Sequence, residues 1–194
     1  MEQNAENERL ERIAAHIEAI IRELGEDPSR EGLLKTPRRA AKALIYATSG
    51  YDRKPDEVLT QALFEAEGSG MIIVRDIEFY SMCEHHILPF FGKVSIGYMP
   101  GDKIVGLSKI ARMVDVFAHR LQVQERFTGQ LATTLCEALG ARGVIVRCEG
   151  EHLCMKMRGV EKQHSATVTM AYNGIYETDA TLRSEFLDML ATKA

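Results

Sequence analysis

Apolar residues recur at helical spacing near the start of the chain. Within residues 5–25 they stand three or four positions apart, at Leu10, Ile13, Ile17, Ile20 and Leu24. This spacing places one apolar seam along a helix whose other positions carry mainly Glu and Arg. Further helices are expected from Thr36 to Gly50 and from Pro55 to Gly68. The pattern therefore predicts a helical N-terminal region.

From residue 71 the pattern changes to alternation, which is typical of strands. In the segment 91–100, Val94, Ile96 and Tyr98 alternate with more polar or smaller residues. Two helical segments follow, and alternation then returns before a last helix. Strands are expected at residues 71–82, 91–100, 143–150 and 165–174, and helices from Ser108 onward, over residues 124–140 and over residues 181–192.

This order of hairpin, helix pair and hairpin predicts the fold class. It is α+β, with a four-stranded antiparallel sheet and helices on one face, in residues 69–194 behind the helical residues 1–68. Such a sheet has two open edges and an uncovered face, which are liabilities in a lone chain. Closing the edges against further copies gives a barrel made of several subunits. We therefore expect a homo-oligomer.

Metal-binding chemistry is concentrated in two short stretches. The stretch "SMCEHHILPF", residues 81–90, contains Cys83 and His86 at the spacing of a single turn. The stretch "EGEHLCMKMRG" contains His152 and Cys154, which point the same way if the backbone there is extended. Thiolate and imidazole ligands together favour Zn²⁺. The two stretches therefore predict one zinc site formed by distant parts of the chain.

The spacing leaves the kind of site open. One arrangement uses Cys83, His86 and Cys154 as ligands with a water in the fourth position, and leaves His85 and His152 beside the metal as acid–base groups. A closed structural site would add His152 as a fourth ligand. Chance composition without any metal is the third reading. The other two cysteines are expected in the core, because Cys136 follows Leu135 in a predicted helix and Cys148 shares the alternation of Val144 and Val146.

Composition narrows the partners and the compartment. The formal net charge is -4, and no long run of Lys or Arg occurs, which argues against nucleic acid as the main partner. No apolar run approaches the roughly 18–20 residues needed to span a bilayer, and the charged start has no apolar signal core. A cytoplasmic location is expected, where thiols stay reduced.

Three long segments resemble one known family. They are "CEHHILPFFGKVSIGYMP", "GLSKIARMVDVFAHRLQVQERFT" and "GEHLCMKMRGVEKQHSATVT", and they occur in the order found in the zinc type of GTP cyclohydrolase I. The resemblance spans about residues 30–190. It implies a tunnelling fold whose subunits form a barrel, with two stacked five-subunit rings making a decamer. It also implies conversion of GTP and water to 7,8-dihydroneopterin triphosphate and formate, the first step of folate or pterin biosynthesis.

The same resemblance implies roles for the metal-binding stretches. Cys83, His86 and Cys154 match the zinc ligands of the family. His152 matches the histidine that protonates N7 of the purine. His85 matches the second catalytic histidine, which is associated with later proton transfers and ribose opening.

Substrate contacts also follow from the resemblance. Glu125 matches the carboxylate that holds the guanine edge, and Gln124 lies next to it in the same pocket. Guanine presents N1–H and N2–H₂ side by side, and these two donors suit one carboxylate. The ribose and triphosphate contacts are matched by Ser108, Lys109, Arg112 and Arg158, and a neighbouring subunit is expected to supply Arg39 and Lys42.

Two rival functions use the same fold or the same zinc. A relative with a cysteine nucleophile, such as the nitrile reductases of deazapurine synthesis, needs a thiol in a different motif and NADPH. A non-enzymatic zinc protein that only senses a nucleotide leaves His85 and His152 without a role.

Overall fold

The computed structural model describes residues 2–192, with side chains from Asn4 onward. The chain forms two compact units that divide between Ser49 and Gly50. Residues 50–68 therefore pack with the C-terminal unit. The division of the chain into regions 1–68 and 69–194, which the sequence suggests, stays a prediction. None of the helices among the described residues combines the length and apolar character that a membrane span requires.

The N-terminal unit is a pair of helices, α1 (Glu2–Glu23) and α2 (Thr36–Ala47). Leu10 and Ala14 of α1 are buried against Ala41 of α2. The expected seam is only partly used, because Ile20 remains 52% exposed and Leu24 lies beyond the end of the helix. Two expected ends are also wrong. The cap of α2 is Lys35, one residue before Thr36, and the helix ends three residues before Gly50.

The C-terminal unit is built on a five-stranded mixed sheet in the order β5-β2-β3-β6-β7. Four of its strands are the expected ones and pair antiparallel in the order β2-β3-β6-β7. The fifth, β5, has only two residues and runs parallel to β2 at Met82 and Cys83. The strands are β2 (Ile72–Cys83), β3 (Pro89–Met99), β5 (Leu121–Gln122), β6 (Gly143–His152) and β7 (Thr167–Gly174).

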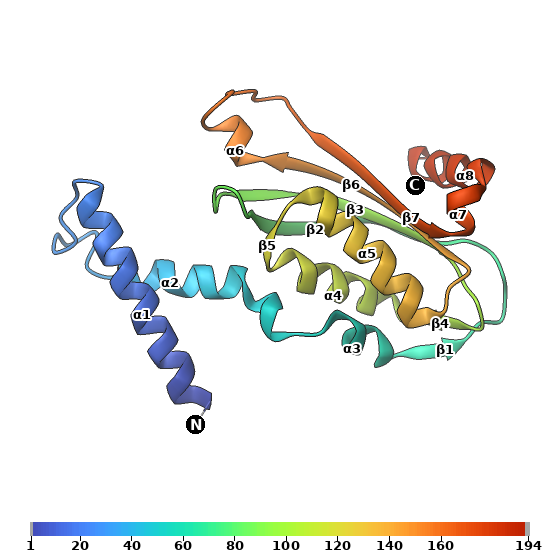
Figure 1. The fold of residues 1–194 in the computed structure, drawn as a ribbon, viewed down its shortest axis with the longest axis horizontal. Coiled ribbons are helices and arrows are strands. Elements are labelled where there is room, and N and C mark those ends of the chain that lie inside the picture. The colour runs from blue at the N-terminus through green and yellow to red at the C-terminus, as the bar shows by residue number, and fades with distance from the viewer. Residues whose placement is uncertain (1, 193–194) are drawn as a thin grey trace. The chain divides into compact units, whose positions relative to one another are not determined.

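Helices pack against both faces of this sheet, on the second face around Ile145, whereas the sequence predicts helices on one face only. On one face lie α4 (Leu107–Ala118) and α5 (Gln124–Leu139), as Figure 1 shows. On the other face, Ile145 of β6 forms a separate cluster with Tyr176 of α7 (Ile175–Thr178) and Phe186 of α8 (Ala180–Ala191). Alternation explains this, because Val144 and Val146 face α5 while the residue between them faces away.

Two local expectations before α4 are wrong. The helix that begins at Pro55, α3 (Pro55–Thr60), stops well before Gly68, because β1 (Leu63–Glu65) pairs with β4 (Lys103–Val105). A tertiary partner overrides the local helical pattern here. Ser108 does not cap α4, since the cap is Gly106 and the helix begins at Leu107.

The main core lies between the sheet and helices α4 and α5. Phe79 of β2 packs against Phe127 of α5 with ring centroids 5.0 Å apart, and against Phe90 of β3 at 5.7 Å. Cys148 is fully buried in this core and Cys136 packs against it, as expected. Burial raises the pKa of Cys148 to about 12, so this thiol stays protonated and unreactive. Cys83 and Phe90 are buried in the same core, which therefore extends to the end of the sheet where β2 and β6 stop.

Leu131 tests how much this core contributes to stability. It lies fully buried on α5, so Leu131→Ala should lower the free energy of unfolding by about 2–5 kcal/mol, measured by urea denaturation at fixed protein concentration. The control is Thr133→Ala, at an exposed position on the same helix, which should change it by less than about 0.5 kcal/mol. Equal effects of the two changes would contradict the packing described.

Candidate metal centre

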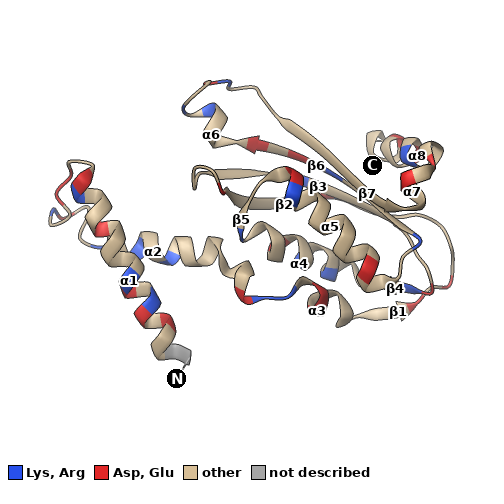
Figure 2. Cartoon of the chain, in the orientation of Figure 1, with Lys and Arg blue, Asp and Glu red and all other residues tan. Residues whose placement is uncertain are grey.

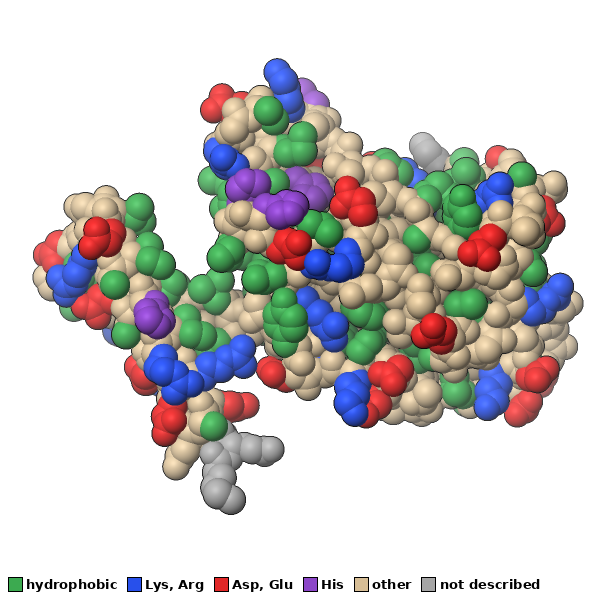
Figure 3. All heavy atoms as spheres, viewed as in Figure 1, with side chains coloured by type: hydrophobic (Ala, Val, Ile, Leu, Met, Phe, Trp, Pro, Cys, Tyr) green, Lys and Arg blue, Asp and Glu red, His purple; other side chains and the backbone are tan. Residues whose placement is uncertain are grey.

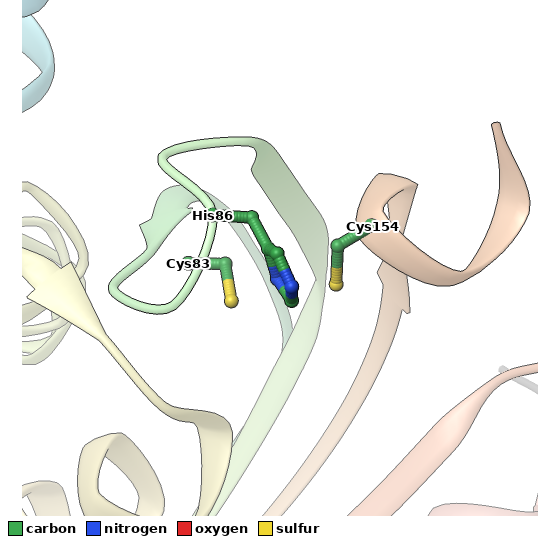
Figure 4. Close-up of side chains that lie close together, drawn as sticks. All are labelled: Cys83, His86 and Cys154. Carbon is green, nitrogen blue, oxygen red and sulfur yellow. The ribbon is translucent and has the colours of Figure 1, made fainter. Parts of the chain in front are cut away.

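The turn between β2 and β3 presents the first donor groups. It is closed at both sides, because the amide of Cys83 donates to Leu88 at 2.8 Å and the amide of Ile87 donates to Cys83 at 2.8 Å. Ile87 has φ 52°, a left-handed conformation that is rare for a β-branched residue. Such a strained position is typical of a functional turn. The tight turn brings the side chains of Cys83 and His86 to one side (Figure 4).

The end of β6 presents the third donor. β6 pairs with β3 so that His152 lies opposite Phe90, and the short helix α6 (Leu153–Lys156) begins directly afterwards with Cys154 in its first turn. The ligand atoms of Cys83, His86 and Cys154 all lie within 4.8 Å of one another. Figure 4 shows the three side chains side by side, with the imidazole of His86 between the two thiols. The structure thus brings the three expected ligands together.

The chemistry of this group fits a zinc ion. Two thiols and one imidazole are the donors that zinc prefers over oxygen-binding cations. Burial raises the pKa of the Cys154 thiol, and the neighbouring Cys83 thiol raises it further, because two adjacent thiolates repel each other. A divalent cation between them would remove that repulsion and favour both thiolates. Among the described residues, the donor group consists of Cys83, His86 and Cys154, and His152 is not part of it.

His152 is held next to the donor group by other contacts. Its ring stacks on Phe90 with centroids 4.5 Å apart and planes 7° apart. Its Nε2 lies 2.9 Å from Oε1 of Gln124, the first residue of α5. Burial lowers the pKa of His152, while the nearby Glu125 carboxylate acts in the opposite direction. The ring is therefore fixed in plane and orientation, and it is not among the grouped metal donors.

His85 occupies a more open position on the same turn. Its side chain is 64% exposed, and its ring centroid lies 6.2 Å from that of His86. Histidine side chains gather at this end of the sheet, near α6, in Figure 3. The site therefore contains a donor group and two further imidazoles, one fixed and one exposed.

An ion pair ties this turn to the start of α5. Glu84 accepts a hydrogen bond from Arg126, which keeps the pKa of this carboxyl below its usual range. Arg126 also donates to the side chain of Gln122 at 3.1 Å and to the carbonyl of Leu121 at 2.9 Å. Sequence reasoning missed this contact, because nothing in the spacing of Glu84 and Arg126 pairs them. The turn, β5 and α5 are held as one piece.

Some of the expected substrate contacts lie at this same end of the sheet. Glu125 is exposed in the first turn of α5, and its charge influences His152. The charge of Arg158, just beyond α6, favours the thiolate of Cys154. Gln124 is buried, and its side-chain amide has partners within the protein. A substrate contact by Gln124 stays a prediction.

Other expected contacts lie elsewhere in the chain. Ser108 and Lys109 stand at the start of α4, just after Val105, whose amide donates to the Tyr98 hydroxyl. Tyr98 lies eight residues beyond Phe90 on β3, roughly 25 Å along an extended strand. Figure 1 shows the same separation, with α4 beginning near β4 and ending near β5. Within one chain, the start of α4 therefore lies far from the donor group. Arg112 is exposed and lies one helical turn after Ser108 on α4.

Arg39 and Lys42 belong to the N-terminal unit. They lie on α2 and line a hollow of ≈ 350 Å³ together with Leu34, Lys35 and Arg38. The basic residues of α2 are visible in Figure 2. Such a cluster of cations suits an anion with several charges. Within its own unit, the placement is compatible with the phosphate role that the resemblance implies.

Comparisons with known proteins establish the family. Residues 13–191 match the family model of GTP cyclohydrolase I, so this chain belongs to that family. The chain is 53% identical to GTP cyclohydrolase 1 of Leptospira biflexa over 91% of its own length and 96% of the relative's. It is 51% identical to GTP cyclohydrolase 1 of Porphyromonas gingivalis, with 96% of each chain covered, and 52% identical to that of Methylococcus capsulatus, with 90% and 94% covered.

The donor group predicts how much zinc variants of the protein bind. Cys83→Ala and Cys154→Ala should each lower bound zinc to a small fraction of the amount per chain in the unchanged protein, because each removes one of three protein ligands. The measurement is elemental analysis of purified protein, with circular dichroism as a check on folding. Cys136→Ala is the matched control and should keep its zinc, since Cys136 packs against the core. Full zinc content in both site variants would rule out the donor group.

Proposed function

We propose that this protein is a GTP cyclohydrolase I, which converts GTP and water to 7,8-dihydroneopterin triphosphate and formate. The observation that carries the proposal is the Cys83, His86 and Cys154 donor group next to His152, in a chain that belongs to this family. We further propose that zinc is the resident metal, that the active form is a homo-oligomer, a decamer of two five-subunit rings, and that the protein acts in the cytoplasm, where its thiols stay reduced.

The first chemical step places His152 as the proton donor. A zinc ion held by the donor group would supply Lewis acidity for activating water at neutral pH. His152, as imidazolium, gives its proton to N7 of the guanine, which makes C8 electrophilic. Water adds to C8 and the C8–N9 bond of the imidazole ring breaks. A second water releases C8 as formate.

The later steps involve the ribose and the exposed imidazole. His85 moves protons while the ribose opens and rearranges. Closing the new six-membered ring forms a carbon–nitrogen bond and expels one water. Two waters enter and one leaves, so the overall reaction consumes one water per GTP.

Recognition of GTP divides between a carboxylate and several cations. Glu125 accepts from N1–H and N2–H₂ of guanine, and Gln124 lies beside it at the start of α5. A triphosphate with a charge near minus four needs several fixed cations, and arginine offers forked contacts. We assign the ribose and phosphate contacts to Ser108, Lys109, Arg112, Arg158, Arg39 and Lys42.

The positions of these expected contacts support the proposed oligomer. Ser108 and Lys109 lie at the far end of the sheet from Cys83 in the same chain. A substrate that touches both groups at once must therefore lie between different copies of the chain. The active site is complete only when one subunit supplies the donor group and another supplies the start of α4.

Turnover of GTP tests the proposed reaction. The purified zinc protein should release formate from GTP and form a fluorescent pterin after oxidation of the product. His152→Ala should lower kcat by about 10²–10⁴-fold, the usual contribution of a general acid. The matched control is His16→Ala, at an exposed position on α1, which should turn over GTP normally. NADPH oxidation without formate would favour a reductase, and GTP binding without turnover would favour a sensor.

Mixed oligomers test whether the site is shared. His152→Ala and Lys109→Ala subunits carry their defects at opposite ends of the sheet, so a shared site is restored where the intact end of each meets the other. Co-expressed, doubly tagged hetero-oligomers should therefore be more active than the mean of the two parent variants. Activity equal to that mean would show that each chain works with its own residues only.

A further inference from the structure

The side chain of Gln124 is oriented unambiguously by its partners. It is 1% exposed, and its Nε2 lies 2.9 Å from the carbonyl oxygen of Thr167 and 3.3 Å from that of Cys148. Carbonyl oxygens only accept hydrogen bonds, so the group facing them is the NH₂ of the amide. The reversed amide would place oxygen against oxygen in a buried site. The Oε1 atom, which faces His152, is therefore an acceptor.

Two threonines extend this order into a directed chain. The Thr128 hydroxyl lies 2.7 Å from the main-chain carbonyl oxygen of Gln124 and must donate to it. The Thr169 hydroxyl lies 2.6 Å from that of Thr128, so Thr169 is the donor of this pair. Its oxygen, 3.2 Å from Nε2 of Gln124, then accepts from the amide. The two hydrogens of the amide are thus shared among three acceptors, the carbonyl oxygens of Thr167 and Cys148 and the Thr169 hydroxyl, and all three lie on the Nε2 side.

We infer that this chain of hydrogen bonds fixes the tautomer of His152, and that Gln124, Thr169 and Thr128 are positioning residues for it. Since Oε1 of Gln124 only accepts, the ring nitrogen 2.9 Å away, Nε2, carries a hydrogen. Nδ1 is the nitrogen that is left to exchange a proton with a ligand. The inference rests on the proposed function, in which that ligand is the purine ring of GTP and the accepting atom is N7.

The surroundings of the chain fit such a role. Phe90 stacks on the imidazole and restricts rotation of its plane. Gly150 of β6 leaves room for the amide, because a Cβ at this position would lie 2.5 Å from Oε1 of Gln124. Thr128 and Thr169 lie on α5 and β7, so the network joins three elements of the unit to His152. A fixed ring avoids reorganisation when the proton moves.

Paired substitutions at position 169 test the inference. Thr169→Val keeps the shape but removes one of the three acceptors of the Gln124 amide, whereas Thr169→Ser keeps the hydroxyl. We expect Thr169→Val to lower kcat by about 10–100-fold with little change in KM for GTP, and Thr169→Ser to recover most of that loss. Thr133→Val, the same change at an exposed position on α5, serves as the matched control, and zinc content is measured for every variant.

Crystal structures of the two Thr169 variants give a readout that does not depend on turnover. In Thr169→Val the distance between Gln124 and His152 should exceed the 2.9 Å of the unchanged protein, and in Thr169→Ser it should be retained. Thr128→Val breaks the chain of hydrogen bonds at its other end and should give the same loss of kcat. It replaces Thr169→Val in the test if Thr169→Val does not fold.

The outcomes separate the two proposals. An unchanged protein that releases no formate from GTP contradicts the proposed function, while the crystal structures still decide the orientation of His152. If the unchanged protein is active and Thr169→Val keeps both its kcat and its contact to His152, the positioning role is wrong. Equal losses in Thr169→Val and Thr169→Ser would likewise show that the hydroxyl is not responsible.

Discussion

The register between β3 and β6 is the constraint on which the site depends. Phe90 pairs with His152 at one end of this ladder, and Met99 pairs with Gly143 at the other. Because side chains alternate along a strand, a slip of one residue would turn His152 to the opposite face and move Cys154 away from the β2–β3 turn. Alternating core residues prevent the slip, since Val94, Ile96 and Val146 must all face α5. The donor group is thus positioned by the hydrophobic pattern of the whole sheet.

The end of the sheet where β2 and β6 stop contributes residues to both the core and the candidate site. Phe90 is fully buried, packs against Phe79, and also stacks on His152. Arg126 joins the turn to α5 through Glu84, while Gln124 joins α5 to His152. A site on such packed elements is held more rigidly than one on free loops. The same contacts that stabilise this end of the sheet also fix the orientation of His152.

Long strands and the metal donors are predictable from the sequence, because each depends on a local pattern. The alternation of Val94, Ile96 and Tyr98 predicts a strand whatever its neighbours are, and the two short stretches with Cys and His predict convergence. In contrast, β5 has only two residues, and β1 exists because β4 lies beside it. No local pattern specifies these pairings. The bond between Gln124 and His152 depends on side-chain orientation across 28 residues of sequence, which spacing alone does not determine.

The open edges of the sheet support the proposal that several copies of the chain associate. β7 is an edge strand of eight residues, and its outward row, Val168, Met170 and Tyr172, is 52%, 38% and 40% exposed. At the opposite edge, β5 covers only two residues of β2. Exposed apolar side chains beside unpaired backbone groups favour association with another strand. In the proposed oligomer, such edges are where further copies would continue the sheet. On this proposal, association and catalysis depend on the same surfaces.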